Sequence, residues 1–120
     1  MIEDIYKTID IIVKAQKKAR QNDDYLTLMV NAEALLEFIP QLITYSVEQE
    51  SEYRKFEAKY SNEKDEKGKL NSGAYAETQA KATEWYKEWR KAIQFIELMY
   101  EMVNLSKKLA TSVDKSLQAN

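Results

Sequence analysis

The chain contains no cysteine and no histidine, and among its 120 residues it has only 2 glycines and 1 proline. The lack of cysteine excludes disulfides, thiolate metal sites and thiol nucleophiles, and gives no sign of an oxidising compartment. The lack of histidine removes the commonest general base and the commonest metal ligand, which excludes most hydrolase and metalloenzyme sites. So little glycine and proline leaves few tight turns, which predicts a few long helices.

The chain is rich in apolar residues, and its charges are nearly balanced. Hydrophobic residues make up 44% of it, enough for the core of one domain, so we expect residues 1–120 to form a single helical domain. The net charge is −2, and no segment has the basic excess that phosphate binding requires, so nucleic acid is not the favoured partner. We expect no cofactor and no metal. The N-terminus lacks the pattern of an export signal, which predicts a cytoplasmic protein.

Hydrophobic periodicity predicts three helices, over about residues 2–20, 24–60 and 74–113, with one polar loop over residues 61–73. The first helix is marked by Ile2, Ile5, Ile9, Ile12 and Ala19, with Tyr6 and Val13 beside them. The second keeps one phase through Tyr25, Leu28, Ala32, Leu35, Ile39, Leu42, Ser46, Gln49, Tyr53, Phe56 and Tyr60. The third keeps step through Tyr75, Gln79, Ala82, Tyr86, Trp89, Ile93, Ile96, Tyr100, Val103 and Ala110.

Pro40 lies inside the second predicted helix, and the hydrophobic phase continues unbroken on both sides of it. This continuity predicts a kink at Pro40 rather than a break. The two longer helices are each roughly 50–60 Å long at about 1.5 Å per residue, beyond the diameter of about 35 Å of a compact chain of this size. The sequence therefore predicts an elongated all-α protein, with a short N-terminal helix and a long antiparallel helical hairpin.

Residues 25–47 are the most apolar stretch: 15 of these 23 residues are apolar, and none is Lys or Arg. Glu33 and Glu37, with no flanking basic cluster, argue against a membrane span. A helix that is apolar almost all round needs cover on most sides, and the first helix is too short to supply it. We therefore expect a homodimer. The residues expected to mediate self-association are Leu26, Val30, Phe38, Ile43 and Tyr45.

Aromatic and basic residues gather in the other half of the predicted hairpin. The residues expected to bind a partner there are Trp85, Arg90, Trp89, Lys55, Lys59 and Lys81. Trp and Arg are the residues most enriched at protein-binding hot spots. The same combination suits single-stranded nucleic acid, whose bases stack on exposed rings while basic groups follow the phosphates. Most rings at helical spacing are ordinary core, however, and each basic group here has acidic neighbours.

Two carboxylate pairs, Glu33 with Glu37 and Glu97 with Glu101, are each spaced by one helical turn. Helical-bundle enzymes hold magnesium with such pairs, and an all-helical nucleotide-hydrolysing enzyme is the corresponding alternative. These residues lie beside the predicted seam rather than in it, as solvated helix faces do. We therefore expect a protein that is not an enzyme.

Residues 72–109 combine the alanine-rich entry AYAETQAKA, then Tyr86, then a long amphipathic run that ends in Lys107 and Lys108. This third of the chain resembles the C-terminal helix of small all-helical proteins encoded by bacteriophages and prophages. The resemblance implies a phage accessory protein, either a helper in DNA recombination and single-strand handling or an inhibitor of a host system such as bacterial immunity. We expect an adaptor or inhibitor that docks a protein partner, with a single-stranded nucleic-acid accessory or a virion component as alternatives.

Overall fold

The computed structural model describes residues 1–119, with side chains described for residues 1–109 and for Thr111. Its regular structure is helical throughout this range: α1 (Ile2–Gln21), α2 (Tyr25–Ser61), α3 (Gly73–Lys81) and α4 (Glu84–Ala119). The predicted all-α class is confirmed. The number of helices differs from the prediction, because four are present within residues 1–119 where three were expected.

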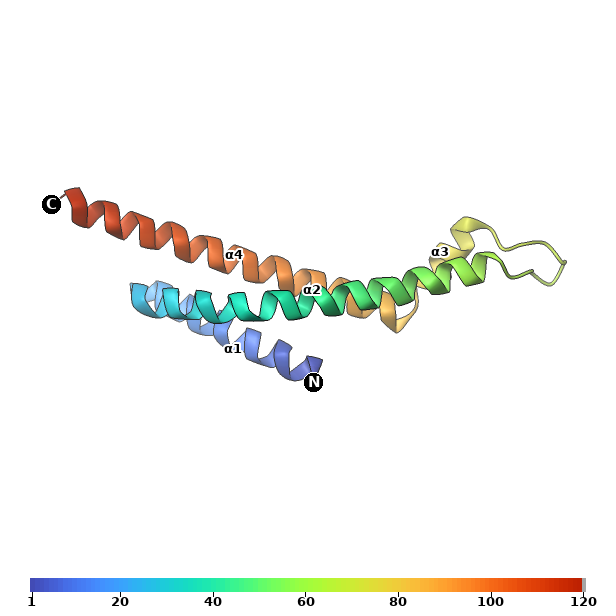
Figure 1. Cartoon of the computed structure of the whole chain (residues 1–120), viewed down its shortest axis with the longest axis horizontal. Helices are drawn as coiled ribbons and strands as arrows, with labels where there is room; N and C mark the ends of the chain where they lie inside the picture. The colour runs from blue at the N-terminus through green and yellow to red at the C-terminus, as the bar shows by residue number, and fades with distance from the viewer. Residues whose placement is uncertain (120) are drawn as a thin grey trace. The chain divides into compact units, whose positions relative to one another are not determined.

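The chain divides into two compact units, which are described separately. Unit 1 consists of Met1–Gln41 together with the chain from Phe95 onward, and unit 2 consists of Leu42–Gln94. Unit 1 therefore holds α1, the start of α2 and the later part of α4, drawn in blue, cyan and red in Figure 1. Unit 2 holds the rest of α2, α3 and the start of α4.

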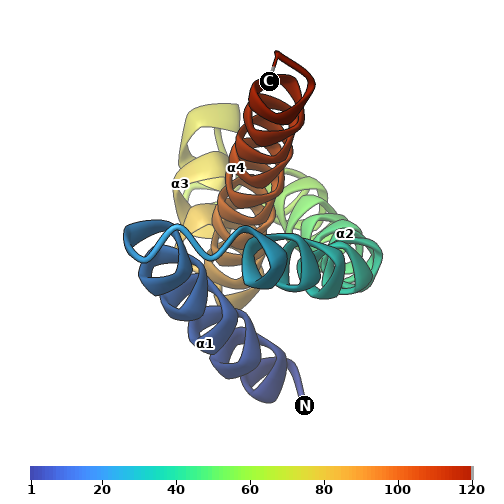
Figure 2. The same ribbon diagram turned by 90° about the vertical axis from the view of Figure 1, so that its left-hand side faces the viewer.

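In unit 1, α1 and α2 are joined by a tight turn, visible in Figure 2. Asp24 caps the start of α2, since its Oδ1 accepts from the Thr27 backbone N–H (3.2 Å) and its Oδ2 from the Thr27 hydroxyl (2.6 Å). The Tyr6 ring lies 4.3 Å from the Phe95 ring, and Gln16 is bonded to Ser106, so α1 and α4 run in the same direction. The buried apolar residues of α1 and α2 here are Tyr6, Ile9, Val13, Ala19, Leu28, Ala32, Leu35 and Ile39.

In unit 2, α2 and α4 pack with opposite directions. Tyr45 contacts Glu88, whereas Phe56, further along α2, contacts Trp85, which is earlier on α4. The seam predicted for α2 is confirmed here, because Leu42, Ser46 and Tyr53 are buried. Within unit 2, α2 and α4 therefore form an antiparallel helix pair.

The single helix predicted over residues 74–113 is wrong, because α3 ends at Lys81 and α4 begins at Glu84. Thr83 caps the start of α4: its Oγ1 accepts from the Tyr86 backbone N–H at 3.4 Å and donates to the Ala80 carbonyl at 2.7 Å. This cap offers the backbone an alternative to continuing the helix.

The seam predicted for the third helix is also wrong in part. The core positions are Ala76, Ala80, Ala92, Ile96, Met99 and Val103. Tyr75 and Tyr100, which were expected in the seam, are 49% and 45% exposed. The predicted seam position Ala110 has its side chain outside the described residues.

The predicted loop is confirmed closely, since residues 62–72 separate α2 from α3. It is an ordered turn: Asp65 Oδ1 accepts from the backbone N–H groups of Lys67 (2.8 Å) and Lys69 (3.0 Å). Gly68 has φ of 78°, a conformation that glycine adopts without strain. Within α2, the helix continues through Pro40, which is exposed.

Candidate interaction surfaces

Seven aromatic rings of unit 2 contact one another in two groups, the first of Tyr53, Tyr86 and Trp89 and the second of Phe56, Tyr60, Tyr75 and Trp85. Tyr53 is only 2% exposed and stacks on Trp89, with ring centroids 5.6 Å apart. In the second group, the Phe56 ring lies 6.1 Å from Trp85 and 5.8 Å from Tyr60. The remaining contacts are Tyr53 with Tyr86 (5.2 Å), Tyr86 with Trp89 (5.8 Å) and Tyr60 with Tyr75 (5.8 Å). These rings therefore hold α2, α3 and α4 together as the core of unit 2.

Two of these seven rings are open to solvent. Trp85 is 38% exposed and Tyr75 is 49% exposed, whereas Trp89 is half-buried between Tyr53 and Tyr86. Trp85 packs against Phe56 of the second group. Of the two predicted tryptophans, only Trp85 thus offers a large open surface to a partner.

Two arginines flank the first group of rings. The Arg90 guanidinium lies 5.7 Å from the centre of the Trp89 ring, which holds this exposed cation beside the aromatic surface. Arg54, which was not predicted from the sequence, lies 4.8 Å from the Tyr53 ring and 5.7 Å from Trp89. Arg54 also pairs with Glu50 (3.8 Å) and Glu57 (3.7 Å), so its charge is locally compensated.

The three predicted lysines of unit 2 differ in their surroundings. Lys81 Nζ lies 2.8 Å from Glu77, and this hydrogen bond raises the pKa of Lys81 and lowers that of Glu77. Lys55 pairs with Glu52 at 3.5 Å, whereas Lys59 is exposed. Two of the three lysines are already paired with carboxylates one turn away, so this surface has little free positive charge for binding phosphates.

The residues predicted for self-association fall into two groups. Leu26 and Val30 of unit 1 are 76% and 56% exposed, and Ile43 of unit 2 is 41% exposed. Phe38 and Tyr45 are half-buried, and the Tyr45 hydroxyl donates to Glu88 Oε2 at 2.8 Å. Tyr45 is therefore engaged within unit 2.

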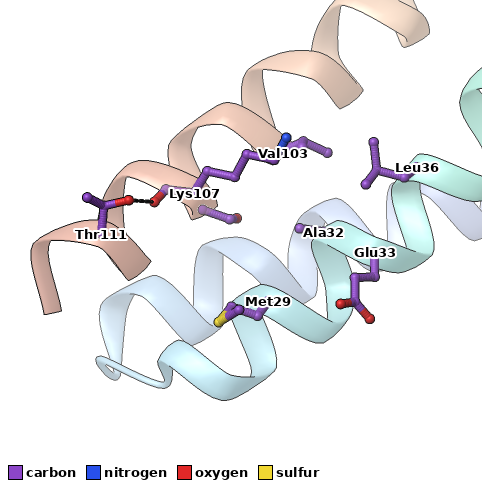
Figure 3. Close-up of a pocket in the computed structure, with 8 residues that line it drawn as sticks. Met29, Ala32, Glu33, Leu36, Val103, Lys107 and Thr111 are labelled. Atoms are coloured by element: carbon purple, nitrogen blue, oxygen red, sulfur yellow. Dashed lines mark hydrogen bonds between the residues drawn. The ribbon is translucent and has the colours of Figure 1, made fainter. Parts of the chain in front are cut away.

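A groove with a volume of about 460 Å³ opens between α2 and α4 of unit 1 (Figure 3). Its walls are formed by Met29, Ala32, Glu33 and Leu36 of α2 and by Val103, Ser106, Lys107 and Thr111 of α4. Met29 and Leu36 are 48% and 41% exposed, and neither was predicted from the sequence as a surface residue of interest. The signal that could have found them is the apolar run of residues 25–47, which leaves apolar side chains on nearly every side of this part of α2.

The two walls of this groove carry opposite charges. Glu33 lies on the α2 side, where its carboxylate points away from α4, and Lys107 extends along α4 toward Val103 (Figure 3). Both are exposed, and no ion pair involves either of them within the described part of the chain. The groove is therefore apolar at its floor, with an unpaired acid on one side and an unpaired base on the other.

The carboxylate pairs considered for magnesium are exposed on unit 1: Glu33, Glu37, Glu97 and Glu101. Within the residues that the structure describes, no group of three or more acidic side chains is close enough to hold a metal ion. These carboxylates lie on the solvent-exposed faces of α2 and α4.

By length and composition alone, α2 is able to cross a membrane, with a mean hydropathy of 1.3 over its most apolar window. Core helices of soluble proteins pass the same test. In α2 only 28% of that window is buried, which agrees with the exposed apolar side chains already described.

Comparison of the chain with protein-family models, with curated proteins and with solved structures finds no match in any of the three.

Proposed function

We propose that this chain is a non-enzymatic, self-associating interaction protein that docks a protein partner through the aromatic and Arg-bearing surface of unit 2. Because residues 72–109 resemble phage proteins, the proposed role is that of an adaptor or inhibitor in the cytoplasm of a bacterial host. It would act on a host defence or DNA-processing complex. The docking surface consists of Trp85, Arg90 and the edge of Trp89.

The observation that carries this proposal is the partial exposure of Trp85, whose ring packs against Phe56. An exposed tryptophan fixed by a neighbouring ring offers a large apolar area at a low cost in side-chain entropy, since its rotamer is already restricted. Arg90 beside Trp89 adds donors that recognise carboxylates or carbonyl oxygens of a protein.

The alternative of a single-stranded nucleic-acid accessory uses the same surface. The two exposed rings, Trp85 and Tyr75, favour it because bases stack on such rings. The ion pairs of Lys55 and Lys81 weigh against it, because they reduce the positive charge available to phosphates.

Capture of host proteins from a bacterial lysate, with wild-type protein and two variants as bait, tests the proposal. Trp85→Ala should lose the captured partner, whereas Ile11→Ala, which removes a side chain that is 67% exposed on α1, should keep it. Far-UV circular dichroism should show both variants as helical as the wild type. Loss of helicity in Trp85→Ala, or equal capture by all three baits, would contradict the proposed docking surface.

We further propose that α2 bends at Pro40. Proline has no N–H to donate to the Leu36 carbonyl, and its ring crowds that carbonyl. Pro40 is exposed, so solvent is available to the unpaired carbonyl, and the boundary between units 1 and 2 follows Gln41.

A further inference from the structure

The groove of unit 1 leaves apolar side chains without cover. Met29 and Leu36 line it, and Leu26 and Val30 are also exposed on the same part of α2. Together these four side chains expose on the order of 400 Å² of apolar surface, comparable to the largest patch on a typical monomer. Tyr100 of α4 is also exposed, seven residues before Lys107 and therefore on the same side of the helix. Each partner of a stable dimer buries about 800 Å², so this patch supplies about half of an interface before its polar rim is counted.

The charged residues beside the groove indicate which kind of partner is complementary to it. The chain has no basic residue from position 21 to 53, so the α2 side of the groove is acidic only, at Glu33 and one turn later at Glu37. The α4 side is basic at Lys107. A surface that is acidic along one edge and basic along the other is complementary to a second copy of itself.

We propose that the groove is the interface of a two-fold homodimer whose axis runs along the groove, parallel to α2 and α4. This inference rests on the proposed self-association and adds its geometry. Rotation about such an axis places α2 of each copy against α4 of the other, so that Glu33 faces Lys107 of the second copy, twice per dimer. The four α2 side chains and Tyr100 are then covered by the same groups of the second copy.

The other two-fold arrangement has its axis across the groove and places α2 against α2. Such a dimer would bring the acidic edge of one copy onto the acidic edge of the other, with no basic residue of α2 before Arg54 to compensate it. Like charges facing one another across an interface disfavour that pairing. The same acidic edge disfavours an anionic lipid surface as the occupant.

Charge reversal tests the pairing. Sedimentation equilibrium of Glu33→Lys and of Lys107→Glu should each show a dissociation constant raised about tenfold, because two favourable pairs become two repulsive ones. The double variant Glu33→Lys/Lys107→Glu should return to within about threefold of the wild type. The controls Asp10→Lys and Lys14→Glu make the same reversals on exposed positions of α1 and should leave the dimer unchanged.

Disulfide trapping tests the axis, and the absence of native cysteine makes single substitutions unambiguous. A mixture of Glu33→Cys and Lys107→Cys proteins should form the mixed disulfide on oxidation, whereas neither variant alone should form one. A disulfide dimer of Glu33→Cys alone would overturn the parallel arrangement. Equal dissociation constants for the wild type and both charge-reversal variants would overturn the groove as the interface. A wild-type protein that is monomeric at about 100 µM, or a monomer that binds vesicles of anionic lipid, would overturn self-association itself. None of these outcomes depends on Trp85, so they are separate from failure of the proposed docking surface.

Discussion

Gln16 Nε2 donates a hydrogen bond of 2.8 Å to Ser106 Oγ across a sequence separation of 90 residues. The same amide donates to the Leu28 carbonyl at 3.0 Å, and Ser106 in turn donates to the Met102 carbonyl at 2.8 Å. One buried side chain thus ties α1 to both α2 and α4. Gln16 Oε1 is buried without a hydrogen-bond partner in the described chain, and a cavity of about 110 Å³ beside Gln16 has room for a water that donates to it.

This pair should show coupled energetics. Ser106→Ala should lower the free energy of unfolding by about 1 kcal/mol, and Gln16→Ala by more, because it also empties a buried volume. Urea denaturation of the two single variants and the double variant should give a coupling of about 1 kcal/mol. Lys14→Ala, at an exposed position of α1, is the control. A coupling near zero would mean that the hydrogen bond adds nothing to the packing of unit 1.

Removing a buried ring of unit 2 should cost more stability than removing an exposed one. Tyr53 is 2% exposed, so Tyr53→Ala should lower the free energy of unfolding by about 3 kcal/mol or more. Trp85→Ala should lower it by no more than about 1.5 kcal/mol, since part of that ring is already in water. The same urea titration measures both. Equal losses in the two variants would place Trp85 in the core and remove it as a docking residue.

Pro40→Ala should stabilise the protein by about 1–3 kcal/mol, because it restores a backbone donor to the Leu36 carbonyl and raises helix propensity. Thermal unfolding followed by circular dichroism measures the change. Gln41→Ala, at the next exposed position of α2, is the matched control and should change little. Destabilisation by Pro40→Ala would show that the packing on either side needs the bend that proline imposes.

The cap of α2 should make stability depend on pH in the acid range. Hydrogen bonds from the Thr27 hydroxyl and backbone N–H lower the pKa of Asp24 below its ordinary value of 3.8. Because the folded chain binds this proton less tightly than the unfolded chain, Asp24 stabilises the fold above about pH 4, and that contribution is lost as the pH falls through the lowered pKa.

The corresponding measurement compares wild type with Asp24→Asn. Asparagine keeps the cap but has no charge, so the wild type should have the higher Tm at pH 7, and the difference should shrink toward pH 2.5. Asp10→Asn, an exposed aspartate of α1, serves as the comparison. A difference in Tm that stays constant with pH would show that the Asp24 carboxylate is no better hydrogen-bonded in the folded chain than in the unfolded one.

The sequence predicted α1 and α2 to within a residue or two, because long apolar periodicity with a polar turn between leaves little ambiguity. It missed the interruption at Ala82 and Thr83, since hydrophobic phase continued across it and only the Thr83 cap distinguished the two helices. Continued phase also misplaced Tyr75 and Tyr100 in the seam, where the smaller Ala76 and Met99 are buried instead.

The candidate sites could also be predicted only in part from the sequence. Exposure of Leu26, Val30 and Trp85 was predictable from their positions outside the seam. The groove between Met29 and Lys107 was not, because it depends on where α4 lies against α2, and periodicity within one helix carries no information about the register of its neighbour.

The most direct test of the central claim is the solution mass by light scattering on a sizing column, with and without a single-stranded DNA oligonucleotide. We predict a dimer whose mass and elution are unchanged by DNA at low and at high salt. A salt-sensitive shift with DNA would contradict a protein-docking role and favour the nucleic-acid alternative. A monomer at every concentration would contradict the claim that the exposed apolar face of α2 is covered by a second copy.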